Sequence, residues 1–362
     1  MRKEINVTKS FLPPQSEFNA ILKKAWDASW ITNRGQLVLE LEEKLKNFLQ
    51  VSNVIAMTNG TLPLQIAIKA LNLTGEIITT PFSYVATTSS IVWEGCTPMF
   101  VDIHPEYLTI DENKIEDAIT AKTTAIMATH VFGNPCNVKA IQSIAEKYNL
   151  KVIYDAAHCF GVKYLGESIF NYGDVSTCSF HATKIFHTGE GGAMFCNDTD
   201  LNNKLFYHHN FGHEGHNKFY GLGINAKMSE LQAAMGLAVF SHFSAIKDAR
   251  LKLYEKYKTA FDSNKQVSLL RIREETEING SYFPLIFETE EVVLEVIEVL
   301  SLNNIYPRRY FYPSLNKLDY VIETTECPIS EYVSSRILCL PLFYGLEDND
   351  VDLIINLLES VL

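Results

Sequence analysis

Residues 151–184 read KVIYDAAHCFGVKYLGESIFNYGDVSTCSFHATK, and this stretch decides which fold the chain can adopt. It holds two apolar runs, at 151–156 and 175–180, and each leads directly into polar residues. Such runs are typical of strands that are buried on both faces. Open α/β sheets bind their ligands at the edge where parallel strands have their carboxyl ends. Both segments therefore predict side chains with a chemical role at that edge.

The same pattern continues on both sides of this stretch. Further apolar runs predict strands at 51–57, 76–81, 99–103, 124–131 and 192–197. Helical patterns at 61–71 and 138–149 lie between them, and the second is clearly amphipathic. Strands that alternate with helices indicate crossover connections, so we predict an α/β fold with a mostly parallel sheet flanked by helices.

A long helical pattern follows, from Ser229 to about Phe261. It begins with Ser229 and Gln232, which have the spacing of a capping box. A helix of this length usually links two bodies, and the chain is long enough for two domains. We expect a large domain over 1–245, including an N-terminal arm, and a smaller α/β domain over 246–362.

The smaller domain is predicted from the order of its elements. The pattern after the long helix gives a strand at 281–288, a helix at 291–304 and a terminal helix at 348–362.

The composition excludes several classes of protein. A net charge of −12 argues against nonspecific nucleic-acid binding, which needs cations to neutralise phosphates. No apolar stretch is long enough to span a membrane, and the N-terminus lacks the core of a signal peptide. The seven cysteines are scattered without a Cys-x-x-Cys pair, so we expect a reduced, cytoplasmic compartment.

The segment Asp155-Ala156-Ala157-His158 ends the first of the two strands. A carboxylate at Asp155 could pair with the pyridinium nitrogen of a cofactor ring and make that ring an electron sink. Ala157 is small enough to lie flat against such a ring, and His158 could donate a hydrogen bond to a phenolic oxygen. The alternative is an aspartate that only caps the next turn.

The segment from Ser179 to Lys184 ends the second strand. A lysine that follows a buried strand is unusual, because lysine is rarely buried without a partner or a purpose. An amine removed from water is suited to Schiff-base chemistry, which makes Lys184 a candidate nucleophile. Ser179 could hold a phosphate oxygen. The alternative is a surface lysine in an ordinary loop.

A third candidate segment is Asn59-Gly60-Thr61, between a predicted strand and a predicted helix. Gly60 lets the backbone approach a ligand closely, and the following helix N-terminus suits a phosphate. The alternative is a routine turn in which Thr61 caps the helix.

Two further patterns, a dinucleotide fingerprint and a group of histidines, lack the features that a nicotinamide site or a metal site would need. Residues 221–226 match the dinucleotide fingerprint G-x-G-x-x-A, but no apolar strand precedes them, so we reject a nicotinamide site. Four histidines lie close together at 208, 209, 213 and 216. They lack a metal-binding spacing and a cysteine partner, so we expect no metal site; a polar loop beside an anionic pocket explains them equally well.

Taken together, these motifs resemble a known family. Four of them occur in this order: Gly60-Thr61, Asp155-x-x-His158, Ser179-Phe180-His181-x-x-Lys184 and Glu190-Gly191-Gly192. They are similar to the DegT/DnrJ/StrS sugar aminotransferases, a branch of the aspartate aminotransferase (fold type I) superfamily. The resemblance covers nearly the whole chain.

The resemblance implies a pyridoxal 5'-phosphate cofactor, with Lys184 as the Schiff-base lysine and Asp155 at the ring nitrogen. It implies that Tyr84, in PFSYVAT at 81–87, stacks on the ring face opposite Ala157. It also implies a homodimer with shared active sites, in which Asn225 reaches the cofactor phosphate from the partner subunit. The family's usual arginine two positions later is Lys227 here, so a bidentate contact at that position is not expected.

Within the family, the segments VTKSFLPP at 7–14 and RRYFYP at 308–313 resemble the dTDP-4-amino-4,6-dideoxyglucose transaminases. That implies transfer of an amino group from L-glutamate to C4 of a nucleotide-linked 4-keto-6-deoxyhexose, for amino-sugar and O-antigen biosynthesis. We expect His181, Arg309 and Tyr310 to contact this substrate. His181 is typical of C4-aminating members.

Three alternatives stay open at this point. The first is an aminotransferase that acts at C3 of the sugar. The second is a sugar dehydratase on the same fold, although those enzymes carry histidine where this chain has Lys184. The third is a catalytically silent binding protein on the same scaffold, because fold alone does not establish function.

Overall fold

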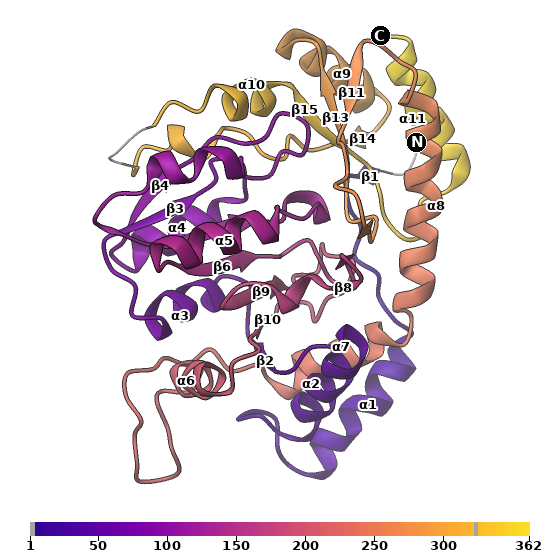
Figure 1. Ribbon diagram of the computed structural model, residues 1–362. Coiled ribbons are helices and arrows are strands. Elements are labelled where there is room, and N and C mark those ends of the chain that lie inside the picture. Colours follow the sequence, from indigo (N-terminus) through magenta and orange to yellow (C-terminus); the bar gives the residue numbers. More distant parts are fainter. Residues whose placement is uncertain (1–3, 322–324) are drawn as a thin grey trace.

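A computed structural model of the chain describes residues 4–321 and 325–362. Its largest element is a seven-stranded sheet with the strand order β2-β10-β9-β6-β5-β3-β4 (Figure 1). The strands are β2 (Val54–Met57), β3 (Glu76–Thr79), β4 (Thr97–Phe100), β5 (Thr123–Thr129), β6 (Lys151–Asp155), β9 (Val175–Ser179) and β10 (Gly192–Phe195). Both neighbours of β10 are antiparallel to it and the other pairs are parallel, which confirms the mostly parallel sheet.

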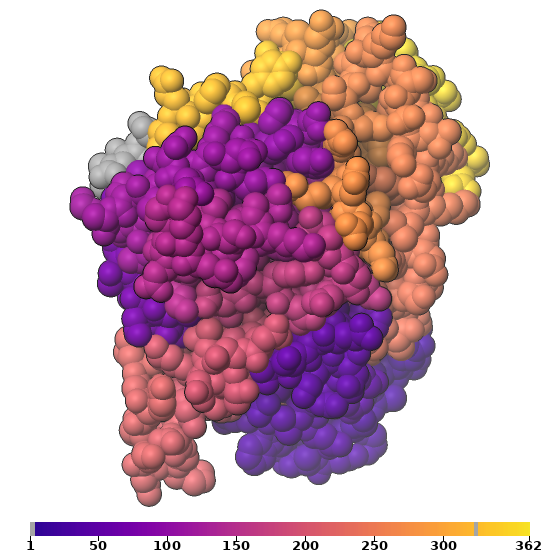
Figure 2. All heavy atoms as spheres, in the orientation of Figure 1, coloured from indigo at the N-terminus to yellow at the C-terminus, as the bar shows by residue number. Residues whose placement is uncertain are grey.

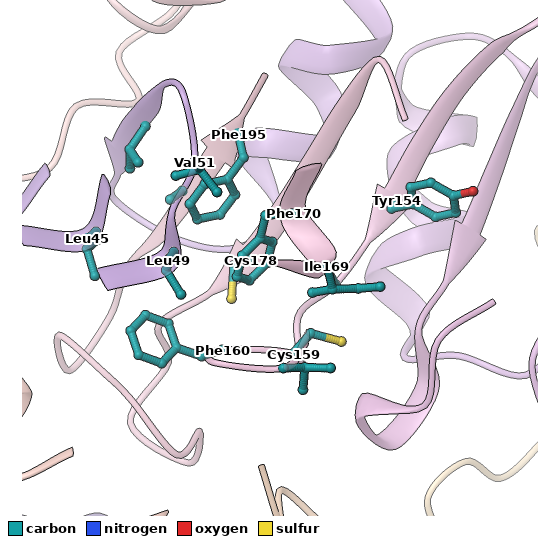
Figure 3. Packing of buried hydrophobic residues seen from close by; sticks show 14 of the residues in the cluster. Leu45, Leu49, Val51, Tyr154, Cys159, Phe160, Ile169, Phe170, Cys178 and Phe195 are labelled. Atoms are coloured by element: carbon teal, nitrogen blue, oxygen red, sulfur yellow. The ribbon is translucent and has the colours of Figure 1, made fainter. Parts of the chain in front are cut away.

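Helices cover both faces of this sheet. They are α2 (Gln36–Leu49), α3 (Leu62–Ala70), α4 (Val85–Trp93), α5 (Val138–Tyr148), α6 (Thr199–His209) and α7 (Glu230–Phe240). Alternate residues of a strand point to opposite faces. Ile126 of β5 accordingly joins a core with α2, α5 and α7, whereas Met127 joins a second core with α3 and α6. Figure 3 shows part of the first core, around Phe160, Phe170 and Phe195. The predicted layers are therefore confirmed.

The C-terminal part has its own core. A three-stranded antiparallel sheet, β11-β13-β15, packs with helices that include α8, α9 and α11. The elements are α8 (Phe243–Phe261), β11 (Val267–Leu269), β13 (Phe283–Phe287), α9 (Glu290–Leu302), β15 (Ile337–Leu340) and α11 (Asp348–Glu359). At the other end of the chain, β1 (Ile5–Asn6) pairs with β14 (Ile305–Tyr306), so the N-terminal segment crosses onto this part. The division into 1–245 and 246–362 stays a prediction.

Several elements were not predicted from the pattern. They are the helices α2, α4 and α6 and the strands β1, β11, β14 and β15 given above, together with α1 (Gln15–Asp27), β7 (Lys163–Tyr164), β8 (Glu167–Ser168), β12 (Thr276–Glu277), α10 (Pro328–Arg336) and short 3-10 turns at 112–114, 116–118, 131–133, 169–171 and 315–317. In the described part of the chain, no helix combines the length and the apolar character needed to cross a membrane.

The single long helix predicted from Ser229 to Phe261 is wrong, because the structure has two helices there, α7 and α8. The predicted capping box at the start of α7 is present. The break lies at Ser241 and His242. The His242 ring pairs with Glu17 of α1 at 2.8 Å, and Phe243 packs against the backbone at Gly161. These tertiary contacts override a helical pattern that continues through the break.

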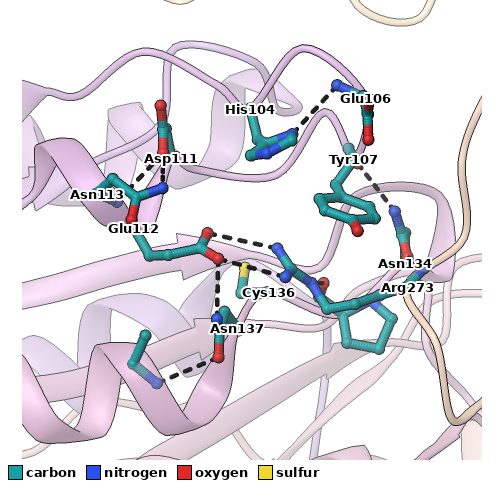
Figure 4. Close-up of polar contacts among 12 residues, drawn as sticks. His104, Glu106, Tyr107, Asp111, Glu112, Asn113, Asn134, Cys136, Asn137 and Arg273 are labelled. Atoms are coloured by element: carbon teal, nitrogen blue, oxygen red, sulfur yellow. Dashed lines mark hydrogen bonds and ion pairs between the residues drawn. The ribbon is translucent and has the colours of Figure 1, made fainter.

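A polar cluster joins the C-terminal part to the large sheet (Figure 4). The guanidinium group of Arg273, beyond β11, lies 3.3 Å from the Glu112 carboxylate and 4.2 Å from the centre of the Tyr107 ring. The side chain of Asn137 donates a hydrogen bond to the same carboxylate. The space-filling view shows the two parts packed against each other (Figure 2). This contact holds the segment that leads to β13 in place beside the sheet.

Candidate active site

The two segments that opened the sequence argument lie side by side. β6 and β9 are neighbours in the sheet, with Asp155 in register with Thr177. Asp155 is the last residue of β6 and Ser179 the last of β9, so both lie at the carboxyl edge. The predicted meeting of these two segments is confirmed.

The carboxylate of Asp155 is buried and held by two hydrogen bonds. The Thr87 hydroxyl donates to Oδ2 at 2.7 Å, and the backbone N–H of Ala157 donates to Oδ1 at 3.1 Å. Burial raises the pKa of Asp155, while the bonds from Thr87 and Ala157 and the charge of Lys184 lower it. The carboxylate is therefore fixed in orientation, and a cationic partner would stabilise its ionised form.

The ring of His158 is fixed in one orientation. The backbone N–H of Phe132 donates to its Nδ1 at 3.0 Å, so the ring proton resides on Nε2. Burial and the nearby Lys184 hold the pKa of His158 well below its usual value. Phe132 itself has a left-handed backbone (φ 56°), which is uncommon for a bulky residue and is found near functional sites. The site therefore contains a neutral histidine with one free N–H donor.

Lys184 is half-buried, and its amine lies 3.1 Å from the hydroxyl group of Tyr282. Both residues line one small pocket together with Ala157 and His158. Ala157 is the only partly exposed residue of the segment 155–158, so its small side chain faces the open side. The structure thus brings the predicted lysine, the small residue and the histidine together.

Gly60 and Ser179 also meet. A Cβ atom added at Gly60 would lie 2.8 Å from the Ser179 hydroxyl oxygen, so only glycine fits there. The side chain of Asn59 accepts hydrogen bonds from the N–H groups of Thr61 and Leu62 at 2.9 Å each. Thr61 therefore does not cap α3 by its side chain. This arrangement leaves the hydroxyl groups of Thr61 and Ser179 at the start of a helix, which suits a phosphate.

Tyr84 and His181 lie at the rim of the site. Tyr84 precedes α4, is 58% exposed, and its ring centre is 6.5 Å from that of Phe311. The Nδ1 of His181 is 2.8 Å from the Thr183 hydroxyl, and its Nε2 is 3.5 Å from the Glu190 carboxylate. Both rings remain reachable from outside the protein, and their predicted contacts stay predictions.

Asn225 lies beside the end of β2, since the carbonyl of its neighbour Ala226 accepts a hydrogen bond from the Thr58 N–H at 2.9 Å. It is exposed, and its side-chain oxygen accepts a hydrogen bond from Lys227 at 2.7 Å. Burial lowers the pKa of Lys227, whose amine lies over the Phe211 ring. Residues 211–222 form a loop that projects from the body (Figures 1 and 2). No strand precedes residues 221–226, which agrees with the rejection of a nicotinamide site.

The other two predicted substrate residues have partners in the C-terminal part. Arg309 forms a 2.6 Å ion pair with Glu290 and lies over the Tyr312 ring at 3.7 Å. The ring of Tyr310 is 5.6 Å from that of Tyr282, and burial raises the pKa of Tyr310 to about 12. The ring of Tyr310 therefore contacts the site residue Tyr282, whereas the guanidinium group of Arg309 is paired with Glu290.

The sequence argument missed three residues that shape this site: Thr87, Phe132 and Tyr282. Thr87 lies in the segment already singled out for Tyr84, one helical turn further on, so its position was a usable signal. Phe132 and Tyr282 follow no motif. They contribute a backbone N–H and a single hydroxyl group, which no residue pattern reveals.

The histidine cluster does not form a metal site in the described residues, where no group of metal-binding side chains comes together. His209 is buried against the Phe206 carbonyl, and burial lowers its pKa to about 4. His208 bonds to the Lys204 carbonyl, and His213 packs on Phe219. These histidines stabilise α6 and the start of the projecting loop.

Comparison with known proteins extends this picture. Residues 14–359 match the model of the DegT/DnrJ/EryC1/StrS aminotransferase family. The chain is 40% identical, over the full length of both proteins, to dTDP-4-amino-4,6-dideoxy-D-glucose transaminase from Shigella dysenteriae. It is 31% identical to GDP-perosamine synthase from Escherichia coli O157:H7, with 92% of each chain covered.

A solved structure supports the same relationship. The fold is similar to that of DesI in the presence of its TDP-sugar product, with a TM-score of 0.94 and 30% identity, covering 99% of this chain and 93% of the other. The fold-type expectation and the family resemblance are both confirmed. The chain belongs to the DegT/DnrJ/EryC1/StrS aminotransferase family, whose members are pyridoxal-phosphate-dependent sugar aminotransferases.

Proposed function

We propose that this chain binds pyridoxal 5'-phosphate at the carboxyl edge of the sheet and transfers an amino group to a nucleotide-linked sugar. The observation that carries the proposal is that Ala157, His158 and Lys184 lie together at the carboxyl edge of the sheet, and that the Ala157 N–H donates to the buried carboxylate of Asp155. The ring nitrogen, the phenolic oxygen and the phosphate of the cofactor each need a matching group on the protein.

Each part of the cofactor has a matching group. The carboxylate of Asp155 suits a protonated ring nitrogen, and the Nε2–H of His158 suits the phenolic oxygen. The close approach of Gly60 to Ser179 forms a phosphate cradle beside Thr61. On the side of Ala157 a cofactor ring can lie close to the protein, because the Ala157 side chain is only a methyl group. The residues therefore fit the cofactor.

Once bound, pyridoxal phosphate supplies an aldehyde for condensation with an amine and a ring that accepts electrons. Lys184 provides the amine, and later carries the proton between the reacting carbon atoms. Asp155 keeps the ring nitrogen charged. Thr87, which donates to Asp155, orients that carboxylate.

Sodium borohydride tests this assignment directly. The visible absorption band of the purified protein should disappear on reduction, and peptide mapping should then find the cofactor on Lys184. Attachment to any other lysine would refute the proposed role. The alternatives are separated by two other observations: a dehydratase of this fold has histidine in place of Lys184, and a silent scaffold would show no turnover in an assay with an amino donor.

For the substrate, we propose a dTDP-linked 4-keto-6-deoxyglucose aminated at C4, with L-glutamate as donor. The 40% identity over the full length of the Shigella dysenteriae transaminase supports this choice. The more distant GDP-perosamine synthase leaves another nucleotide and sugar as the second candidate. His181 stands at the rim beside Lys184 and is the side chain on which the sugar would rest.

The substrate is tested by offering dTDP-4-keto-6-deoxyglucose and its 3-keto isomer separately with glutamate. NMR of the product should locate the amine at C4, because a misplaced reacting carbon loses orders of magnitude in rate. Amination of the 3-keto sugar alone would overturn the C4 assignment and leave the aminotransferase assignment intact. The GDP-linked 4-keto sugar in the same assay separates the two nucleotides.

We also propose a homodimer in which Asn225 completes the partner's phosphate site. The exposed position of Asn225 supports this arrangement, because a second chain could reach it. A cytoplasmic location accords with the seven cysteines, which are all unpaired and buried.

A further inference from the structure

We propose that Tyr282 is a positioning residue: its hydroxyl group holds the amine of Lys184 whenever that amine is not bound to the cofactor. The inference rests on the proposed role of Lys184 and adds a partner that no motif identified. In transamination the lysine must be released while the amino group resides on the cofactor, and its free amine must then stay near the reacting carbon to move a proton.

The first argument is the contact itself. The Lys184 amine and the Tyr282 hydroxyl oxygen are 3.1 Å apart, which is hydrogen-bond distance. A hydroxyl group can accept a bond from an ammonium group and donate one to a neutral amine. The contact can therefore persist through both protonation states that a proton carrier adopts.

The second argument is that Tyr282 is held far more firmly than Lys184. Tyr282 is 6% exposed, whereas Lys184 is only half-buried on a flexible side chain. The Tyr282 ring makes edge contacts with His158 at 4.8 Å and Phe132 at 5.7 Å between centres. A lysine side chain has many rotamers of similar energy, and a fixed hydrogen-bond partner favours one of them.

The third argument is the anchoring of the segment before β13. The Asn279 side chain donates to the His158 carbonyl at 2.9 Å, and the Ser281 hydroxyl donates to the same oxygen at 2.8 Å. Asp155 ends strand β6 of the large sheet and Lys184 follows strand β9, whereas Tyr282 belongs to the C-terminal part. The bonds from Asn279 and Ser281 to His158, which lines the pocket, therefore fix the position of Tyr282 relative to the pocket.

The test compares Tyr282→Phe with Tyr257→Phe. Tyr257 is a matched control, because it is a buried tyrosine of the C-terminal core whose hydroxyl donates to the Pro341 carbonyl at 3.1 Å, outside the pocket. Competitive labelling of the cofactor-free proteins with acetic anhydride, followed by peptide mass spectrometry, reports the reactivity of Lys184 relative to the exposed Lys122. In Tyr282→Phe, Lys184 should react several-fold faster than in wild type and in Tyr257→Phe, because loss of the hydroxyl frees the amine. Equal or slower labelling would overturn the proposal.

Kinetics give the second readout. For the loaded enzyme we expect kcat to fall roughly 10- to 100-fold in Tyr282→Phe with little change in KM, since the loss affects proton transfer and not binding. If Tyr282→Phe does not fold, Tyr282→His replaces it; a ring nitrogen there should keep labelling closer to wild type than Tyr282→Leu. A His variant that labels like the Leu variant would contradict the role of the polar group.

The two proposals can fail separately. If borohydride attaches the cofactor to a lysine other than Lys184, the proposed function of Lys184 fails first. If it attaches to Lys184 but the labelling rate is the same in wild type and Tyr282→Phe, only the role of Tyr282 fails.

Discussion

The pocket around Lys184 and the surface around Asn225 contain residues of the same proposed site, yet their surroundings are opposite. Asp155 and His158 are each 5% exposed and are held by hydrogen bonds from Thr87 and Phe132 of their own chain. Asn225 is exposed and bonds to its neighbour Lys227. We call the first group the buried half of the proposed site and the surface at Asn225 its surface half; only the buried half is held in place by contacts within a single chain.

Several large apolar side chains are also exposed elsewhere: Trp93 at the end of α4 is 81% exposed, Leu222 and Phe219 of the projecting loop 73% and 62%, and Trp26 of α1 61%. The comparison teaches that residues at the sheet edge are oriented by contacts within one chain, whereas the proposed role of Asn225 depends on a second copy of the chain. The predictions below test this division.

The largest effect is expected in the buried half. Lys184→Ala should abolish turnover, because no other lysine of the described residues lines the pocket beside Asp155, and cofactor should bind only noncovalently. Steady-state assays and the absorption spectrum measure both effects. Transamination by this variant above the rate of free cofactor would break the assignment.

Asp155→Asn should lower kcat roughly 10²-fold or more, since a neutral amide cannot hold a pyridinium charge. Its effect on stability has the opposite sign. Burial raises the pKa of Asp155, so in the cofactor-free protein the stability tied to this group is present below about pH 4 and lost as pH rises through the folded pKa. Above that window, the cofactor-free Asn variant should melt at the same or a higher temperature than wild type. A lower melting temperature together with wild-type kcat would contradict both roles.

In the surface half, Asn225→Ala should weaken cofactor binding about tenfold, the loss expected for one hydrogen bond to a charged group. Mixed dimers sharpen this prediction. Subunits with Lys184→Ala and subunits with Asn225→Ala, joined in one dimer, should regain one intact site if Asn225 serves the partner. Cofactor titration of the mixed dimer then shows one tight site per dimer. No tight site in the mixed dimer would place Asn225 in its own chain's site, and an active monomer by light scattering would exclude the shared arrangement.

The last prediction concerns stability and not activity, and it involves a buried histidine behind the site. Burial lowers the pKa of His130 to about 3, and its Nδ1 accepts a bond from the Cys136 N–H. Because the folded pKa lies below the unfolded value, this stability is present above pH 6.5 and lost as pH falls. Between pH 6.5 and 5 the loss is about 2 kcal/mol for one such group. His130→Asn, which keeps an acceptor, should flatten this part of the unfolding free energy curve. An unchanged slope, measured by denaturant unfolding, would show that His130 does not titrate on unfolding.

All seven strands of the large sheet could be predicted from local pattern. The apolar runs that end at Asp155 and Ser179 identified two strands and, by the rule for parallel strands, one shared edge. That worked because strand burial and helix amphipathicity are written in residues close together in the chain. The same reasoning failed between Ser229 and Phe261, where a continuous helical pattern hides a break made by contacts with Glu17 and Gly161.

The sequence by itself therefore determined the sheet, its carboxyl edge and the chemical types of residue that lie there. The tertiary structure decided which groups surround them. Thr87, Phe132 and Tyr282 lie 68, 26 and 98 residues from the side chains they contact. A hydrogen bond between such distant positions depends on how whole elements pack, and each needs only one hydroxyl or one backbone N–H. That requirement is common to many residues, so only the folded chain shows which of them meets it.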